Sequence, residues 1–275
     1  MTGLISVSSA PIAKLGGKKY CDLVGTLEVM RKVYQESAVD GFELQLEPEW
    51  DSENPPLTDT QFADWRETPK YTTGEISTLV KREEMPILSV HASRDIGSYL
   101  CSGRERDVEK GRRLIHDSLS LSEDLRARVC VFHLWDTWKE EIDVNQLKGI
   151  LLDTAVQFLN VKASVENIPT RLRGCTPLSL VSLFDYVTLD LRWASMYDEL
   201  NGFRTLTDSI VNVHLRGRLE QDRWVLDRST FDFYESLRTI ATKWKYSGLL
   251  TLEPEGKMDS SCFRDFLKAM LSLKI

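Results

Sequence analysis

Residues 161–167 read VKASVEN, a short β-type run that ends in the carboxylate of Glu166. Runs of the same kind recur along the whole chain, and a longer helical pattern follows each of them. They are Leu4–Val7, Phe42–Leu46, Ile87–His91, Val129–Leu134, Val161–Glu166, Tyr186–Asp190, Ile210–Leu215 and Leu249–Glu253. Eight runs in 275 residues leave about 34 residues per unit, which suits a strand, a helix and two short loops. Because most runs are continuously apolar, they predict a parallel sheet with helices on one face and a packed interior on the other.

The segments between the runs predict helices on independent grounds. In residues 147–159, apolar side chains recur three and four positions apart, and Asp143 stands where an N-cap belongs. Thr72 with Glu75 forms a capping-box pattern. No low-complexity linker and no helix-only or strand-only block divides the chain. We therefore predict an α/β fold in which residues 1–275 form a single-domain (β/α)8 TIM barrel. An open doubly wound sheet is the alternative, because periodicity alone does not show closure.

Composition and charge limit the class of protein. Hydrophobic residues make up 42% and charged residues 28% of the chain, as expected of a folded protein with a substantial core. The formal net charge of -7 argues against a broad basic face, so nucleic acid is a less favoured partner. No apolar run approaches the roughly 18 residues that cross a bilayer. The five cysteines are scattered without a C-x-x-C pair, which indicates neither a disulfide framework nor a thiolate zinc site. We expect a cytoplasmic protein without a membrane partner, and the sequence leaves its oligomeric state open.

Polar side chains lie on seven of the runs, and six of them stand at the predicted carboxyl ends, where a TIM barrel carries its active site. They are Glu43, His91, His133, Glu166, Asp190, His214 and Glu253. Any one of these residues, taken alone, is most simply explained as a hydrogen-bonded polar side chain with a structural role. Together they are the ligand types of zinc, manganese and iron, and converging carboxylates repel one another unless a cation neutralises them. The set therefore predicts a metal site.

The order Glu166, Asp190, His214, Glu253 resembles the metal site of the xylose isomerase-like TIM barrel superfamily. This superfamily includes sugar isomerases and epimerases and the endonuclease IV type of AP endonuclease (AP endonuclease family 2). Local phrases carry the resemblance: GFEL at 41–44, SVHA at 89–92, VFH at 131–133, VEN at 165–167 and LEP at 252–254. The resemblance implies a divalent ion, zinc or manganese, held by these four residues. His91 and His133, with GSYL at 97–100, are similar to the endonuclease IV branch, which implies a second ion.

The sequence also departs from both branches. The repair enzymes hold a third zinc through Asp-x-x-His and Asp-x-His motifs, which read Asp190-Leu191-Arg192-Trp193 and Asp222-Arg223-Trp224 here. Tryptophan cannot ligate a metal, because its indole nitrogen only donates. A three-metal site is therefore not expected. Trp193 also replaces the histidine with which the sugar epimerases hold substrate.

Three functions fit this constellation. In an isomerase or epimerase, Glu166 and Glu253 would move a proton beside a carbonyl group that a cation polarises. In a phosphodiesterase, a second ion on His91 and His133 would assist attack on phosphorus. The third alternative is a barrel that binds metal and ligand without turnover.

The residues around the expected mouth favour a sugar or sugar-phosphate substrate. Arginine suits phosphate, and a tryptophan offers a flat wall to a sugar ring. The acidic loop from Trp50 to Thr58 would repel DNA. We therefore rank the isomerase or epimerase above the endonuclease. The predicted substrate-binding residues are Glu43, Arg94, Trp193, Arg216, Arg218 and Trp224.

Overall fold

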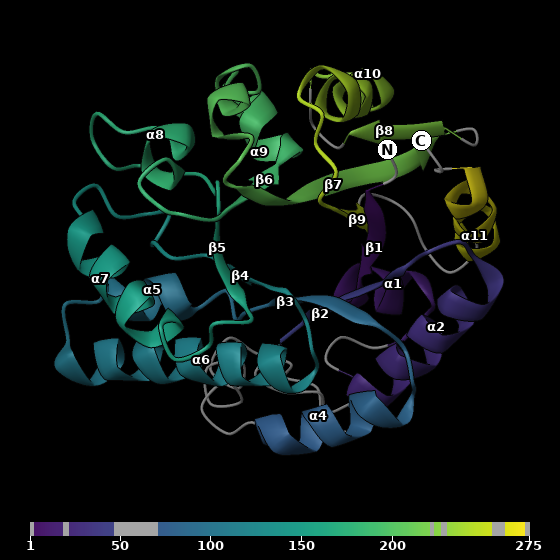
Figure 1. The fold of residues 1–275 in the computed structure, drawn as a ribbon, viewed down its shortest axis with the longest axis horizontal. Coiled ribbons are helices and arrows are strands. Elements are labelled where there is room, and N and C mark those ends of the chain that lie inside the picture. Colours follow the sequence, from purple (N-terminus) through teal and green to yellow (C-terminus); the bar gives the residue numbers. More distant parts are fainter. Residues whose placement is uncertain are drawn as a thin grey trace.

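Eight parallel strands pair edge to edge until the sheet closes on itself (Figure 1). The structure is a computed structural model that describes residues 3–18, 22–46, 71–220, 223–226, 230–254 and 262–272. The barrel strands are β1 (Leu4–Ser8), β2 (Gly41–Gln45), β3 (Ile87–His91), β4 (Val129–Phe132), β5 (Lys162–Glu166), β6 (Val187–Asp190), β7 (Ile210–Glu220) and β9 (Leu249–Pro254). Closure comes from the pairing of β6 with β7, of β7 with β9 and of β9 with β1. The predicted TIM barrel is confirmed, and the open sheet is excluded.

Strand β7 is longer than the sequence predicts. It continues past Leu215 and pairs antiparallel with β8 (Arg223–Leu226), a hairpin strand that the sequence analysis did not anticipate. Gly217 allows the close approach, since a Cβ atom there would lie 3.1 Å from the carbonyl oxygen of Val225. The charged residues after Leu215 interrupt the apolar run and so hide this extension from a reading based on apolar runs.

Helices surround the barrel on its outer face (Figure 1). They are α1 (Ser9–Leu15), α2 (Leu23–Glu36), α4 (Thr73–Arg82), α5 (Ile96–Leu100), α6 (Glu105–Asp124), α7 (Val144–Ala155), α8 (Pro177–Val181), α9 (Leu191–Met196), α10 (Phe233–Arg238) and α11 (Phe263–Ser272). A 3-10 helix spans Gly202–Leu206, and a π-helical turn spans Thr239–Lys243. None of the described helices combines the length and apolar character needed to span a membrane.

Two predicted helix caps are present. Thr72 and Glu75 form a complete capping box at the start of α4, and the Asp143 side chain accepts a hydrogen bond from the Gln146 amide at the start of α7. Helix α7 ends at Ala155, so the predicted apolar periodicity runs beyond the helix. Of the two predicted apolar positions past its end, Phe158 is buried in the core whereas Leu159 is 87% exposed.

The main apolar core lies between the barrel and the helices, and a separate small apolar cluster is formed by Val129, Val131 and Val211. Outward-facing strand residues such as Phe42, Val90, Val165 and Leu252 are fully or almost fully buried in the main core. The side chains at alternate positions point to the opposite face, as the period of two in a strand requires. Many of those inner positions are polar and buried, and this arrangement places the functional groups.

Candidate active site

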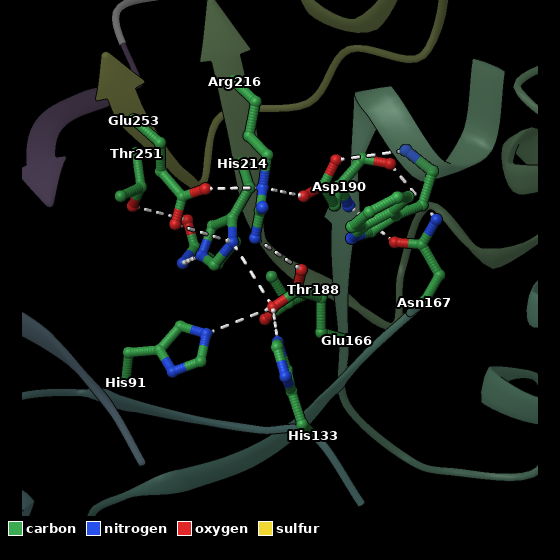
Figure 2. A network of polar contacts seen from close by, with 12 residues as sticks. His91, His133, Glu166, Asn167, Thr188, Asp190, His214, Arg216, Thr251 and Glu253 are labelled. Atoms are coloured by element: carbon green, nitrogen blue, oxygen red, sulfur yellow. Dashed lines mark hydrogen bonds and ion pairs between the residues drawn. The ribbon is translucent and has the colours of Figure 1, made fainter. Parts of the chain in front are cut away.

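The inner faces of six strands bring the predicted strand-end residues into one buried cluster. Its members are Glu43 (β2), His91 (β3), Glu166 (β5), Asp190 (β6), His214 (β7) and Glu253 (β9), none more than 3% exposed. His133, directly after β4, joins them and is partly buried. Figure 2 shows the three histidines around Glu166, with Arg216 between Glu253 and Asp190. All seven predicted polar residues therefore meet in the mouth of the barrel.

A second polar layer lies two residues earlier on the same strands, and the sequence analysis missed it. Its members are Ser89, Ser164, Thr188, Asn212 and Thr251, all buried. The Ser89 hydroxyl and the Asn212 amide donate to Glu43 Oε2 at 2.8 and 3.1 Å. Thr251 donates to Asn212 Oδ1 at 2.9 Å. The spacing of two before each strand-end residue was the signal that could have revealed this layer.

We call His91, His133, Glu166 and His214 the imidazole half of the site. Oxygen Oε2 of Glu166 lies 2.9 Å from His133 Nε2, 3.2 Å from His91 Nε2 and 3.5 Å from His214 Nδ1. The rings of His91 and His133 meet edge to face with centroids 4.9 Å apart. Three imidazole nitrogens therefore surround one carboxylate oxygen.

The outer nitrogens of two of these histidines face acceptors. His91 Nδ1 lies 2.9 Å from the carbonyl oxygen of Ala92, and His214 Nε2 lies 3.2 Å from Glu43 Oε2. A neutral ring that donates from its outer nitrogen presents a lone pair on the inner nitrogen. In both rings that inner nitrogen faces Glu166, so a proton or a metal ion must lie between them. Metal-ligating histidines commonly have this second contact to a carbonyl or carboxylate group.

Burial and neighbouring charges strongly shift the pKa values of the side chains in the imidazole half. Burial alone would lower the pKa of His214, but the neighbouring carboxylates, Glu43 foremost, raise it well above its usual value. Burial alone would raise the pKa of Glu166, but His133 and His214 hold it well below its usual range. Burial lowers the pKa of His133 to about 4, against the opposing effect of Glu166. Glu166 is therefore ionised, and its negative charge is one of the causes that raise the pKa of His214.

We call Asp190, Glu253 and Arg216 the carboxylate half. Arg216 Nε lies 2.5 Å from Asp190 Oδ2 and 2.7 Å from Glu253 Oε2, and Arg216 is 5% exposed. Burial raises the pKa of Asp190 to about 7, although Arg216 acts in the opposite direction. Asp190 Oδ1 is held separately, because it accepts from the backbone amides of Arg192 and Trp193 at the start of α9. Oxygen Oδ2 is thus directed at Arg216.

The donor set fits a metal ion in the imidazole half. Ligand atoms of His91, Glu166 and His214 all lie within 4.8 Å of one another, and so do those of Glu43, His214 and Glu253. Among the described residues, Glu43 Oε1, Glu166 Oε1, Asp190 Oδ2 and His214 Nδ1 are atoms of this cluster that are buried without a hydrogen-bond partner. Buried polar atoms are normally satisfied, so these atoms suit a ligand that is not a protein group, although Asp190 Oδ2 lies 2.5 Å from the charged Arg216 side chain. Asp190 belongs to neither group of three and contacts Arg216 instead.

The other predicted substrate-binding residues are dispersed. The Trp193 ring centroid lies 5.4 Å from the Arg216 guanidinium carbon, so this indole flanks the site. Arg94 is exposed after β3, where its charge contributes to the lowered pKa of His133. Arg218 pairs with Glu220 at 2.6 Å farther along β7. The loop from Trp50 to Thr58 lies outside the described residues.

Trp224 packs away from this polar cluster. Its ring stacks on Phe233 of α10 with centroids 6.0 Å apart and meets Phe266 of α11 edge to face at 6.1 Å. Only 1% of Trp224 is exposed. The placement differs from the expectation that both indoles line the cavity, because β8 is a hairpin strand whose indole covers the apolar helix layer. We therefore leave Trp224 out of the proposed site.

No family model matches the chain, and no curated protein matches it. Solved structures do match. A D-tagatose 3-epimerase-like protein has a TM-score of 0.63 at 19% identity, over 98% of this chain and 97% of that chain. A sugar phosphate isomerase/epimerase from Parabacteroides distasonis ATCC 8503 has a TM-score of 0.65 at 10% identity, over 100% and 96%. An AP endonuclease, family 2, from Brucella melitensis has a TM-score of 0.60 at 14% identity, over 95% and 97%. These likenesses, all below 20% identity, show that the chain shares the fold of these proteins, the TIM barrel that the sequence predicts.

Proposed function

We propose that the protein is an isomerase or epimerase that moves a proton beside the carbonyl group of a small sugar or sugar phosphate. The observation that carries this proposal is the placement of Glu166 and Glu253. Both are buried at the carboxyl ends of their strands, and both contact Arg216, Glu166 at 3.6 Å and Glu253 at 2.7 Å. Two carboxylates that face a common centre can remove a proton from one carbon and return it to the same or the neighbouring carbon.

The surrounding residues support this chemistry. Arg216 offsets the charge of the carboxylates and would stabilise negative charge that develops on a substrate oxygen. Trp193 offers a flat indole beside Arg216, where a sugar ring could pack. Arg94 at the rim suits a phosphate group on a phosphorylated substrate. The fold-level neighbours include a D-allulose 3-epimerase in complex with D-allulose, which is consistent with a small polyhydroxylated substrate.

A divalent ion, zinc or manganese, would be held in the imidazole half by His91, Glu166 and His214. When bound there, it supplies a Lewis acid that polarises a carbonyl or hydroxyl oxygen. The quartet implied by the resemblance shares Glu166 and His214 with this set. The second ion that the resemblance implies, with His91 and His133 as its ligands, stays a prediction, and so does the cytoplasmic location.

An endonuclease IV-like phosphodiesterase is the second candidate, because His91 and His133 both contact Glu166. The net charge of -7 and the replacement of a motif histidine by Trp193 weigh against it. A barrel that binds metal and ligand without turnover is the third.

The test is deuterium incorporation from D2O into the C–H bonds of ketoses, aldoses and their phosphates, followed by proton NMR after the protein is loaded with Mn²⁺ or Zn²⁺ and freed of excess ion. We expect exchange with at least one substrate. Glu166→Gln and Glu253→Gln should each slow it by about 100-fold or more, which is typical of lost acid–base catalysis. Glu109→Gln, on the exposed side of α6, is the matched control and should leave the rate unchanged.

An abasic duplex oligonucleotide is assayed in parallel. Rapid incision at catalytic concentration, with no exchange on sugars, would replace the proposal by the phosphodiesterase. Inactivity in both assays would favour the barrel without turnover.

A further inference from the structure

Arg216 occupies the centre of the carboxylate half. Its Nε atom lies within 2.7 Å of an oxygen of Asp190 and an oxygen of Glu253, and its Nη2 atom lies 3.6 Å from Glu166 Oε1. Three of the four residues that the resemblance assigns to one metal ion therefore contact this guanidinium. Figure 2 shows the arginine side chain between Glu253 and Asp190, on the same strand as His214.

The backbone fixes Arg216 in this position. Residues 212, 214 and 216 alternate along β7, so Asn212, His214 and Arg216 share the inner face of the barrel. Arg216 is the register partner of Glu253 on β9, and His214 is the register partner of Asp190 on β6. The Trp193 indole lies against the guanidinium at 5.4 Å. The pairing of Arg216 with Glu253 on β9 and the contact with the Trp193 ring thus place the arginine.

The guanidinium also meets the electrostatic need that a metal would meet. Buried carboxylates this close repel one another unless a cation lies among them. Arginine stays charged in proteins and can contact several carboxylates at once. A zinc-like ion binds carboxylate oxygen at about 2.0–2.2 Å, so an ion between Asp190 Oδ2 and Glu253 Oε2 would compete for the space and the charge that the Arg216 Nε atom already supplies at 2.5 and 2.7 Å.

We propose that Arg216 is a built-in cation that replaces the divalent ion between Asp190 and Glu253. The chain then binds its metal only in the imidazole half, and the carboxylate half is neutralised by the protein itself. This inference rests on the proposed function only for the ion of the imidazole half. Its test measures metal binding, so its failure is distinguishable from a failure to find a substrate.

The main experiment compares Co²⁺ binding by the full-length protein and by Arg216→Met, with stoichiometry from equilibrium dialysis and coordination from the visible d–d spectrum. Methionine keeps much of the arginine's length but removes the charge. We expect Arg216→Met to bind one Co²⁺ per chain more than the unaltered protein. The additional ion should disappear in Arg216→Met combined with Asp190→Asn. Arg218→Met, two residues farther along β7, is the matched control and should leave the stoichiometry unchanged.

A second measurement avoids the arginine variant in case it does not fold. In the otherwise unaltered chain, Asp190→Asn should change the Co²⁺ dissociation constant by less than about 3-fold, whereas Glu166→Gln should weaken binding by more than about 10-fold, since 1.4 kcal/mol corresponds to a factor of ten. A loss of affinity above 10-fold in Asp190→Asn, or an unchanged stoichiometry in folded Arg216→Met, would overturn the proposal. In either case deuterium exchange on a sugar would leave the proposed function intact.

Discussion

Cys130 on β4 is fully buried on the helix side of the barrel, and this burial raises the pKa of its thiol to about 12. Only the thiolate reacts rapidly with alkylating agents. We predict that iodoacetamide at pH 8.5 leaves Cys130 unmodified in the folded protein and modifies it after unfolding in urea, as read by peptide mass spectrometry. Cys175, which is partly exposed, is the internal control. Equal modification of the two thiols in the folded protein would contradict the structure.

The same shift has a defined effect on stability. A thiol in an unfolded chain has a pKa of about 8.5. Because the folded pKa is higher, the stability associated with the neutral thiol is fully present below about pH 8.5 and is lost as the pH rises toward 12. Cys130→Ala removes this titration. The difference in urea midpoint between the variant and the unaltered protein should therefore change between pH 8 and pH 11 in favour of the variant.

Single residues also show how far the sequence specifies the site. The strand-end positions of Glu166, Asp190, His214 and Glu253 follow from the apolar runs, and the structure places all four in the mouth. The contacts of these four residues cannot be predicted in this way. An apolar run shows which face of the sheet a side chain occupies, but not which residue lies beside it on another strand. Arg216 was expected to bind phosphate, yet its closest contacts are Asp190 and Glu253.

At the scale of elements, the capping box of α4 is a local structure that the sequence fully reveals. The Glu75 amide donates to the Thr72 hydroxyl at 3.2 Å, and the Thr72 amide donates to the Glu75 carboxylate at 2.8 Å. We predict that Thr72→Ala lowers the free energy of unfolding by about 1 kcal/mol, the usual contribution of an N-cap. Thr78→Ala, on the exposed face of the same helix, should cost less than about 0.5 kcal/mol. Urea unfolding followed by circular dichroism measures both, and equal losses would contradict the capping role.

Two helical glycines should respond to alanine in opposite directions. A Cβ atom at Gly97 in α5 would collide with the backbone of Trp135, whereas a Cβ atom at Gly149 in α7 meets nothing within 4 Å. We predict that Gly97→Ala lowers the free energy of unfolding by about 1–3 kcal/mol, as overpacking does. Gly149→Ala should raise it by about 0.5–1 kcal/mol, because alanine favours a helix interior. The same urea titration tests both, and destabilisation by Gly149→Ala would show that its surroundings are tighter than described.

The β7–β8 hairpin was not predictable in the same way. Arg216 and Arg218 interrupt the apolar residues of β7, so a search for continuous apolar runs ends at Leu215. The hairpin depends on partners that are distant in sequence, since Trp224 packs on Phe233 and Phe266. A helix cap depends on residues that lie within four positions of one another, whereas this packing joins Trp224 to Phe266, about forty positions later in the sequence.

At the scale of the whole molecule, the regular recurrence of strand and helix predicted the barrel, and the pairing of β6 with β7 closes it. The net charge of -7 is a property of the same scale. We predict that a fluorescein-labelled abasic duplex shows no anisotropy change with 10 μM protein at roughly 150 mM salt, where even non-specific binders have dissociation constants of about 10⁻⁴–10⁻⁶ M. Binding that weakens steeply as salt is added would instead reveal a local basic face.

The polar interior of the barrel keeps the residues of the candidate site apart from the residues that pack against the helices. Successive residues of a barrel strand point to opposite faces. Val165 and Leu252 pack against the helices, whereas their neighbours Glu166 and Glu253 face the mouth of the barrel. A laboratory evolution experiment could therefore randomise inward-facing positions such as Ser89, Asn212 and Thr251 while leaving every outward-facing strand residue untouched. New specificities should then arise on an unchanged apolar scaffold, and tolerance to substitution should alternate with a period of two along each strand.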